Sequence, residues 1–290
     1  MPSSSLPLHS EHQRTYHENK FVYPVLSRRS KGISIGINLN PDKICNFDCI
    51  YCQVDRREES ETRFVGFEQL IAELDHMLKF VISGEIYKDA KFASVPQNLR
   101  RINDIAFSGD GEPTTYRNFD QIVKEVADLK QKHHADQVKM VLITNASMFH
   151  RKSTLDALKI LDENQGEIWA KLDAGTESYF KTIDRTKIRF SQVLANIALV
   201  AKQRPIVIQS LFMLVNGQPP EEAEIEAYCQ RLNEIVHSGG EIKLVQVYTI
   251  ARRTAEDYVA PLSSEKVDQI ARKVKENTNL NTDVFYGNAD

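Results

Sequence analysis

The stretch CNFDCIYC, residues 45–52, holds three of the four cysteines of this 290-residue chain. The spacing C-x3-C-x2-C places Cys45, Cys49 and Cys52 within eight residues and offers no fourth thiol nearby. A disulfide, a redox dithiol, a structural zinc and an iron–sulfur cluster place different demands on such a set. Other features of the sequence are needed to distinguish these four possibilities.

The composition is ordinary for a globular protein, with 41% hydrophobic and 27% charged residues and a formal net charge of −3. No apolar run approaches the roughly 20 residues of a membrane span. The opening MPSSSLPLHS has neither a charged nor an apolar signal region. The sequence therefore predicts a cytoplasmic protein with no membrane partner, in which clustered thiols bind a metal or do chemistry.

An odd number of clustered thiols fits a disulfide poorly, and structural zinc prefers four closed ligands. The fourth cysteine, Cys229, falls on the apolar stripe of an expected helix between Ile225 and Leu232, which predicts a buried and inert thiol. A [4Fe–4S] cluster on three cysteines keeps one iron without a protein ligand. That vacancy explains the missing thiol, while zinc with a recruited ligand stays an alternative.

Short apolar runs alternate with segments of helical periodicity along most of the chain. The expected strands are 32–39, 102–109, 138–145, 167–175, 205–215, 241–250 and 281–287. The expected helices are 67–84, 119–132, 153–164 with Ser153 as its cap, 189–203, 219–240 and 263–277. Strict alternation with continuously apolar strands predicts a parallel sheet covered by helices, either a partial barrel or a doubly wound open sheet.

We expect three regions: an N-terminal extension over 1–30, a barrel over 31–250, and a C-terminal helix and short strand over 251–290 packed on the barrel. Residues 85–101 interrupt the alternation and are expected to form an inserted loop. In βα architectures the functional residues lie where strands end. Here the strand ends carry the cysteines, SGDGEPT (108–114), TNAS (144–147), KLDAG (171–175), QSLF (209–212) and VYTIARR (247–253).

CNFDCIYC, with the aromatic Tyr51 before its last cysteine, resembles the signature of the radical S-adenosylmethionine (radical SAM) superfamily. SGDGEPT is similar to the Gly-Gly-Glu element of that superfamily, although Asp110 is inserted between Gly109 and Gly111. The resemblance covers about residues 30–250. It implies a partial (β/α)6 TIM-like barrel, a [4Fe–4S] cluster on Cys45, Cys49 and Cys52, and S-adenosylmethionine (SAM) bound to the open iron.

The resemblance also implies cofactor contacts. Gly109, Gly111 and Glu112 correspond to the Gly-Gly-Glu element, which contacts the amino group of SAM in that superfamily. Lys171 and Asp173 point to one face of their strand and match a ligand with a carboxylate and an amino or ribose group; an ordinary ion pair is the alternative. The remaining expected contacts are Tyr51 near the adenine, Asn145 and Gln209. Packing is the alternative role for Tyr51, and ordinary loop hydrogen bonding is the alternative for Asn145 and Gln209.

Within the superfamily, FSGDGEPT and KLDAGTESYFKTIDR look similar to the wyosine tRNA-modifying (4-demethylwyosine synthase type) enzymes. Those enzymes carry further N-terminal cysteines, and this chain has none before Cys45. Two arginine pairs, Arg56 with Arg57 and Arg252 with Arg253, are expected on one barrel face, either as contacts to RNA phosphates or as solvated rim charges.

The expected activity is reductive cleavage of SAM to a 5′-deoxyadenosyl radical, followed by hydrogen abstraction from a substrate that the sequence does not identify. A flavodoxin- or ferredoxin-type electron donor is implied. A small molecule, a peptide or RNA all stay open as substrates. A non-catalytic zinc-binding module is the alternative from another class.

Overall fold

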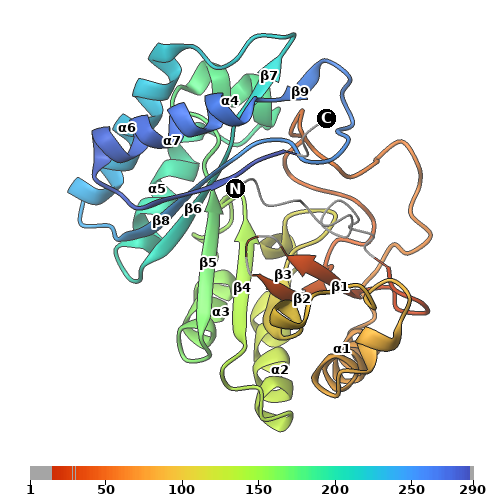
Figure 1. Cartoon of the computed structure of the whole chain (residues 1–290). Coiled ribbons are helices and arrows are strands. Elements are labelled where there is room, and N and C mark those ends of the chain that lie inside the picture. The colour runs from red at the N-terminus through yellow and green to blue at the C-terminus, as the bar shows by residue number, and fades with distance from the viewer. Residues whose placement is uncertain (1–14, 28, 30, 288–290) are drawn as a thin grey trace. The chain divides into compact units, whose positions relative to one another are not determined.

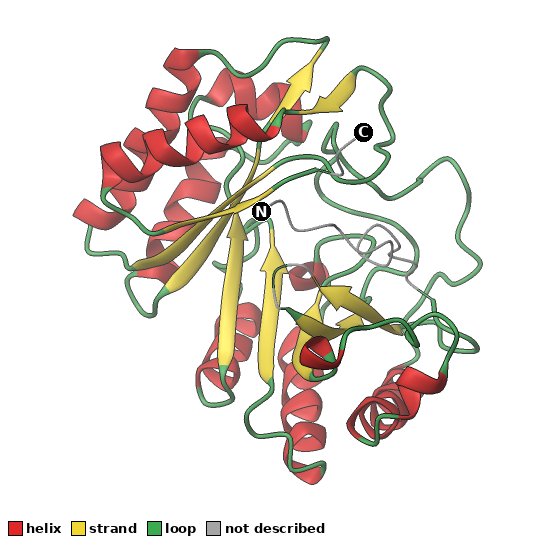
Figure 2. Ribbon diagram, in the orientation of Figure 1, coloured by secondary structure: helices red, strands yellow, loops and turns green. Residues whose placement is uncertain are grey.

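A computed structural model of the chain describes residues 15–27, 29 and 31–287. Most of the expected N-terminal extension, 1–14 with 28 and 30, lies outside the described residues. The fold is α/β, with helices and strands alternating along the chain (Figure 2). It forms two compact units, which are described separately. The first contains the chain up to Cys45, Glu58–Ile143 and Arg151–Glu167; the second contains Asn46–Arg57, Thr144–His150 and the chain from Ile168 onward.

The first unit contains a mixed sheet in the order β1-β2-β3-β4. Its strands are β1 Val22–Ser27, β2 Gly32–Ile37, β3 Ile102–Phe107 and β4 Lys139–Thr144. β1 is antiparallel to β2, and the other pairs are parallel, with Ile35 opposite Ile105 and Ile105 opposite Met140. The helices are α1 Phe67–Ile82, α2 Phe119–Lys132 and α3 Lys152–Asp162, and α2 packs against α3 (Figure 1). Three 3-10 turns are η2 Glu85–Lys88, η3 Gln97–Leu99 and η4 Pro113–Thr115.

The second unit contains a parallel sheet in the order β5-β6-β8-β10. Its strands are β5 Gly166–Lys171, β6 Ile206–Leu211, β8 Ile242–Tyr248 and β10 Thr282–Phe285. A small antiparallel pair joins β7 Met213–Val215 to β9 Val259–Pro261. The helices are α4 Glu177–Asp184, α5 Phe190–Ala201, α6 Glu222–His237 and α7 Ser264–Thr278, with α6 packed between α5 and α7 (Figure 1).

The core explains why these strands do not alternate between buried and exposed residues. Every residue of β2 and of β6 is buried, as expected for parallel strands covered on both faces. The helices bury one stripe each; in α2 it runs through Phe119, Ile122 and Val126. Most expected helices and strands from residue 32 onward are confirmed close to their expected bounds.

Four details differ from the expected pattern. The strand expected over 205–215 is two strands, β6 and β7, which belong to different sheets. The residues of β1 form an edge strand, in keeping with Pro24, which lacks an N–H for a second neighbour. Ser153 is not the cap of α3, because the helix already begins at Lys152 and Arg151 holds the cap position. The short helix α4 was not expected; Thr176 caps it by accepting a hydrogen bond from the backbone N–H of Tyr179. In addition, residues 85–101 contain η2 and η3.

None of the helices in the described part of the chain combines the length and the apolar character needed to cross a membrane.

Candidate cofactor site around the cysteine loop

The cysteine loop, residues 46–52, has no helix or strand of its own. Cys45, directly before it, and Cys49 and Cys52 within it are half-buried cysteines that form no disulfide within the described residues. Cys229 is buried on α6, as its helical spacing predicts. Among the described residues, no three His, Cys, Asp or Glu side chains converge on a point that can hold a single metal ion. Three cysteines within eight residues are the donor type that iron–sulfur clusters take.

Two side chains anchor the start of the cysteine loop. Asn46 donates to Ser147 Oγ at 2.8 Å and accepts from Asn145 Nδ2 at 2.8 Å. The ring of Phe47 is buried edge-on against Phe180 of α4, with 5.8 Å between the ring centroids. The expected cofactor residue Asn145 thus contacts the loop itself, just after the end of β4.

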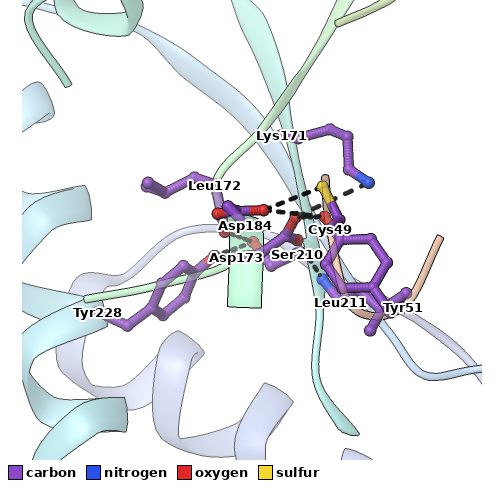
Figure 3. Close-up of polar contacts among 9 residues, drawn as sticks. All are labelled: Cys49, Tyr51, Lys171, Leu172, Asp173, Asp184, Ser210, Leu211 and Tyr228. Carbon is purple, nitrogen blue, oxygen red and sulfur yellow. Dashed lines mark hydrogen bonds and ion pairs between the residues drawn. The ribbon is translucent and has the colours of Figure 1, made fainter. Parts of the chain in front are cut away.

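Tyr51, at the end of the loop, is buried and joins the strand end of β5 (Figure 3). Its hydroxyl donates to Asp173 Oδ2 and lies 3.4 Å from Asp184 Oδ1. Lys171 Nζ lies 4.5 Å from the centroid of the Tyr51 ring and 3.8 Å from Asp173 Oδ2. Cys49 Sγ lies 3.3 Å from Asp184 Oδ1. The fold thus brings the expected residues Tyr51, Lys171 and Asp173 together with Cys49.

The shared burial of these groups perturbs their ionisation. Burial, followed by the charge of Asp173, raises the pKa of Asp184 to about 7. Burial and the nearby Asp184 raise the pKa of the Cys49 thiol well above its ordinary value. Burial alone would lower the pKa of Lys171, but the nearby acidic side chains, Tyr248 and Asp173 first among them, raise it above the ordinary range. Lys171 is therefore held as an ammonium ion among acidic neighbours.

The strand β6 contributes Gln209, which is buried and donates to Gln246 Oε1 on β8 at 2.8 Å. Lys171 is opposite Gln209 in the parallel register, and Gln209 is opposite Gln246. Side chains in register on parallel strands project to the same face. Lys171, Gln209 and Gln246 therefore form a polar row across β5, β6 and β8.

Backbone contacts hold the turn after β5. Asp173 Oδ1 accepts from the N–H of Leu211 at 2.6 Å, which fixes the carboxylate to β6 (Figure 3). Glu224 of α6 accepts from the N–H of Gly175 at 2.5 Å and from Thr176 Oγ1 at 2.6 Å. A Cβ on Gly175 would lie under 3.0 Å from the backbone of Tyr228. A glycine is therefore needed for this turn to reach α6.

The turn after β3, in the first unit, is held differently. Asn38 Nδ2 donates to Asp110 Oδ2 at 2.7 Å, and the N–H of Asp110 donates back to Asn38 Oδ1 at 3.1 Å. A Cβ on Gly109 would lie under 3.0 Å from Asn38, and one on Gly111 under 3.0 Å from the carbonyl oxygen of Ile44. Both glycines thus make room for neighbouring parts of the same chain.

Two hydrogen-bond acceptors at and near this turn are suited to a cationic ligand group. Glu112 is buried and its carboxylate accepts from the N–H of Thr114 at 3.1 Å. Asn40 is 9% exposed, and its Oδ1 is a buried acceptor without a hydrogen-bond partner among the described residues, while its Nδ2 donates to Thr115 Oγ1 at 3.1 Å. Buried acceptors are normally satisfied. Asn40 lies against Gly111, the residue before Glu112. An unsatisfied acceptor there fits a ligand that brings an N–H donor, such as the amino group of SAM.

Several residues at these positions have no pattern in the sequence that identifies them. They are Asn38, Asn40, Asn46, Asp184, Arg185, Gln246 and Tyr248. Gln246 is the exception among these, because a polar residue between the apolar Val245 and Val247 of a buried strand is unusual. The others are found only through the tertiary structure. The roles of the expected site residues toward a cofactor remain predictions.

Comparisons with known proteins bear on this arrangement. Residues 39–229 match the family described as the Radical SAM superfamily. A solved structure titled "Structure of TYW1 with a lysine-pyruvate adduct bound" has a TM-score of 0.53 at 15% identity and covers 84% of this chain and 74% of that chain. At that identity the likeness shows the fold alone, and it confirms the partial (β/α)6 barrel.

Two curated relatives extend the comparison. A protein named GTPase Obg from Brachyspira hyodysenteriae is 26% identical over 90% of this chain and 34% of its own length. The UPF0026 protein MJ1312 from Methanocaldococcus jannaschii is 28% identical over 56% of this chain and 43% of its own length. This chain spans less than half of either relative.

The family match includes all three clustered cysteines and covers more than half of the chain. The protein belongs to the radical SAM superfamily. Membership implies an enzyme, and members of this superfamily generally bind a [4Fe–4S] cluster and SAM.

Proposed function

We propose that this protein holds one [4Fe–4S] cluster on Cys45, Cys49 and Cys52 and cleaves SAM reductively, using the product to abstract hydrogen from a substrate. When bound, the reduced cluster and SAM supply a 5′-deoxyadenosyl radical. The observation that carries the proposal is the buried network linking Cys49 through Asp184, Tyr51 and Asp173 to Lys171, because it joins the cysteine loop to the strand end of β5.

We assign the parts of SAM to groups of matching charge. The ammonium of Lys171 would pair with the carboxylate of the methionine moiety, since a half-buried cation recognises an anion more strongly than a fully solvated one. Glu112 and the unsatisfied Asn40 Oδ1 would accept hydrogen bonds from its amino group. The remaining proposed contacts to SAM are Tyr51, Gly109, Gly111, Asn145, Asp173 and Gln209. The packing around this network would keep water away from the reacting groups.

The electron needed for cleavage is proposed to come from a flavodoxin- or ferredoxin-type donor. The substrate is proposed to be a small molecule, a peptide or RNA. If hydrogen abstraction occurs, deuterium from the true substrate will appear in 5′-deoxyadenosine. That transfer is the measurement that identifies the substrate.

A wyosine-type tRNA modification is the second candidate. It is favoured by the hydrogen bond from the N–H of Ala255 to the carbonyl oxygen of Cys52, at 2.9 Å, because this contact joins the two segments that carry the arginine pairs. Against it, Arg57 Nη2 lies 2.9 Å from Asp55 Oδ2 and Arg56 Nη1 lies 3.9 Å from Asp48 Oδ1, so this pair is partly neutralised. Arg253 is exposed.

The RNA proposal predicts tRNA binding that weakens steeply with salt and is reduced by changing Arg252 and Arg253 to Ala. Each lost phosphate contact would lower the slope of log K against log salt by about 0.9. Filter binding between low and physiological salt measures it. Weak binding with a flat salt dependence would favour a small molecule or a peptide.

The cofactor proposal is tested on protein purified and reconstituted without oxygen. We expect about four irons and four sulfides per chain, and 5′-deoxyadenosine once SAM and a strong reductant are added. Cys49→Ala should lose the cluster and reduce the product to background. Cys229→Ala is the matched control and should retain both, because its thiol is buried on α6. Stoichiometric zinc without SAM cleavage would instead support the non-catalytic zinc-binding module.

A further inference from the structure

The first half of the cysteine loop runs antiparallel to the end of α4 and the residues after it. The N–H of Ile50 donates to the carbonyl oxygen of Ile183 at 2.8 Å, and that of Asp48 to the carbonyl oxygen of Asp184 at 3.1 Å. Thr186 Oγ1 donates to the carbonyl oxygen of Asn46 at 2.9 Å. Ile183 and Asp184 are the last residues of α4, so these two N–H groups satisfy carbonyl groups at the helix C-terminus that have no partner within the helix, and the Thr186 hydroxyl adds a third contact.

Arg185 occupies the centre of this run. Its Nε donates to the carbonyl oxygen of Asp48 at 2.7 Å, and its Nη2 lies 3.1 Å from Asp48 Oδ2. Its backbone ends α4 in the left-handed region, with φ 41° and ψ 49°. Glycine and asparagine adopt that region more readily than arginine does. An arginine at this position is therefore explained by its side chain rather than by its backbone.

The guanidinium also contacts a third segment. Arg185 Nη1 lies 2.6 Å from Glu256 Oε1, and the adjacent residue Ala255 donates its N–H to the carbonyl oxygen of Cys52. One side chain thus links the cysteine loop, the end of α4 and the segment after β8. Charge-assisted bonds from the planar guanidinium fork give such a link a defined geometry.

We propose that Arg185 is a positioning residue that fixes the backbone of the cysteine loop and thereby sets where Cys49 and Cys52 present their thiols. The significance of those thiols rests on the proposed function, but the link itself is a property of the chain. Arg185 touches neither thiol; it acts through the Asp48 carbonyl and through the segment containing Ala255 and Glu256.

The first experiment uses the cluster-free full chain. Arg185→Asn keeps a residue that accepts the left-handed backbone and removes the guanidinium. We expect peptides covering residues 46–52 to exchange amide hydrogen about tenfold faster, since one charge-assisted bond changes an opening equilibrium by that order. The matched control is Lys187→Gln, which removes a nearby exposed positive charge and should leave exchange unchanged. Arg185→Lys should give an intermediate rate.

The second experiment uses reconstituted protein. Arg185→Asn should alter the electron paramagnetic resonance spectrum of the reduced cluster and raise KM for SAM more than it lowers kcat, because the ligands are displaced rather than removed. Glu256→Gln, which leaves α4 intact, should produce a smaller change in the same direction.

Several outcomes overturn the inference. If residues 46–52 of Arg185→Asn exchange amide hydrogen at the wild-type rate, the proposed link does not exist. Faster exchange throughout the chain, with an unaltered cluster spectrum, makes Arg185 a general stability residue instead. A wild-type chain that takes up no cluster counts against the proposed function, while the exchange result from the cluster-free chain still decides the link.

Discussion

The turns after β3 and after β5 follow parallel strands of the same fold but are built from different interactions. The β3 turn, residues 108–114, relies on close backbone approach at Gly111 and on amide contacts of Asn38. The β5 turn, residues 171–176, buries the charges of Lys171 and Asp173 beside Tyr51. The β3 turn thus depends mainly on close backbone packing, whereas the β5 turn depends mainly on interactions between charged side chains.

This difference predicts how each turn tolerates change. Neutral hydrogen bonds are worth about 1 kcal/mol net, whereas removing one partner of a buried ion pair costs several times more. Substitutions of a carboxylate should therefore have unequal effects in the two turns, while substitutions of the close-packed glycines should have similar ones.

The largest effect is expected for Asp173→Asn. The change removes the carboxylate that lies 3.8 Å from the Lys171 ammonium, and we expect the free energy of unfolding to fall by about 3 kcal/mol, measured by urea denaturation. Lys171→Met combined with Asp173→Asn should recover part of this loss, because the double variant buries no unpaired charge. A loss below about 1 kcal/mol for the single variant would mean that solvent screens the pair.

An intermediate effect is expected for Gly111→Ala and Gly175→Ala. Each new methyl group would lie under 3.0 Å from backbone atoms, of Ile44 or of Tyr228 respectively. Overpacking of this kind costs about 1–3 kcal/mol, measured by thermal and urea unfolding. Gly111→Ala should also reduce iron content, since Ile44 precedes Cys45.

Gly217→Ala is the control for these glycines. Its φ is +75° and no atom lies within 4 Å of a Cβ placed there, so only the backbone cost of about 1 kcal/mol applies. If Gly111→Ala costs no more than this control, the close approach of Ile44 is not rigid.

The smallest effect is expected for Asp110→Asn. The Asp110 carboxylate is partly exposed, and an asparagine side chain keeps an oxygen that can accept from Asn38 Nδ2, so the free energy of unfolding should fall by about 1 kcal/mol or less. Urea denaturation beside Asp173→Asn measures the contrast directly. Equal losses in the two variants would contradict the distinction between the turns.

The sequence predicted the fold class because apolar strands and amphipathic helices alternate with periods that local residues determine. It also predicted that Tyr51, Lys171 and Asp173 belong near the cysteines, because strand ends in such folds meet at one edge. The short helix α4 was missed, although Thr176 followed by Glu177 is a cap and an acidic first turn.

The contacts of Asp184 and Arg185 with the cysteine loop had no comparable signal. Asp184 lies 135 positions from Cys49, and nothing in the local pattern of either segment specifies the other. Asn40 shows the same limit, because an unsatisfied acceptor is visible only when all neighbouring donors are known. Long-range polar partners depend on the tertiary structure and are not encoded in periodicity.

The pairing of the cysteine loop with residues 183–186 also has a consequence for biosynthesis. A ribosome that adds 5–20 residues per second needs roughly 7–27 s to make the 135 positions between Cys49 and Asp184. During that interval the three cysteines have already been synthesised, but residues 183–186, which hold the backbone of the cysteine loop, have not. Maturation of a cluster is therefore expected after translation has passed α4, and a chain truncated before it should be a poor recipient for iron and sulfide.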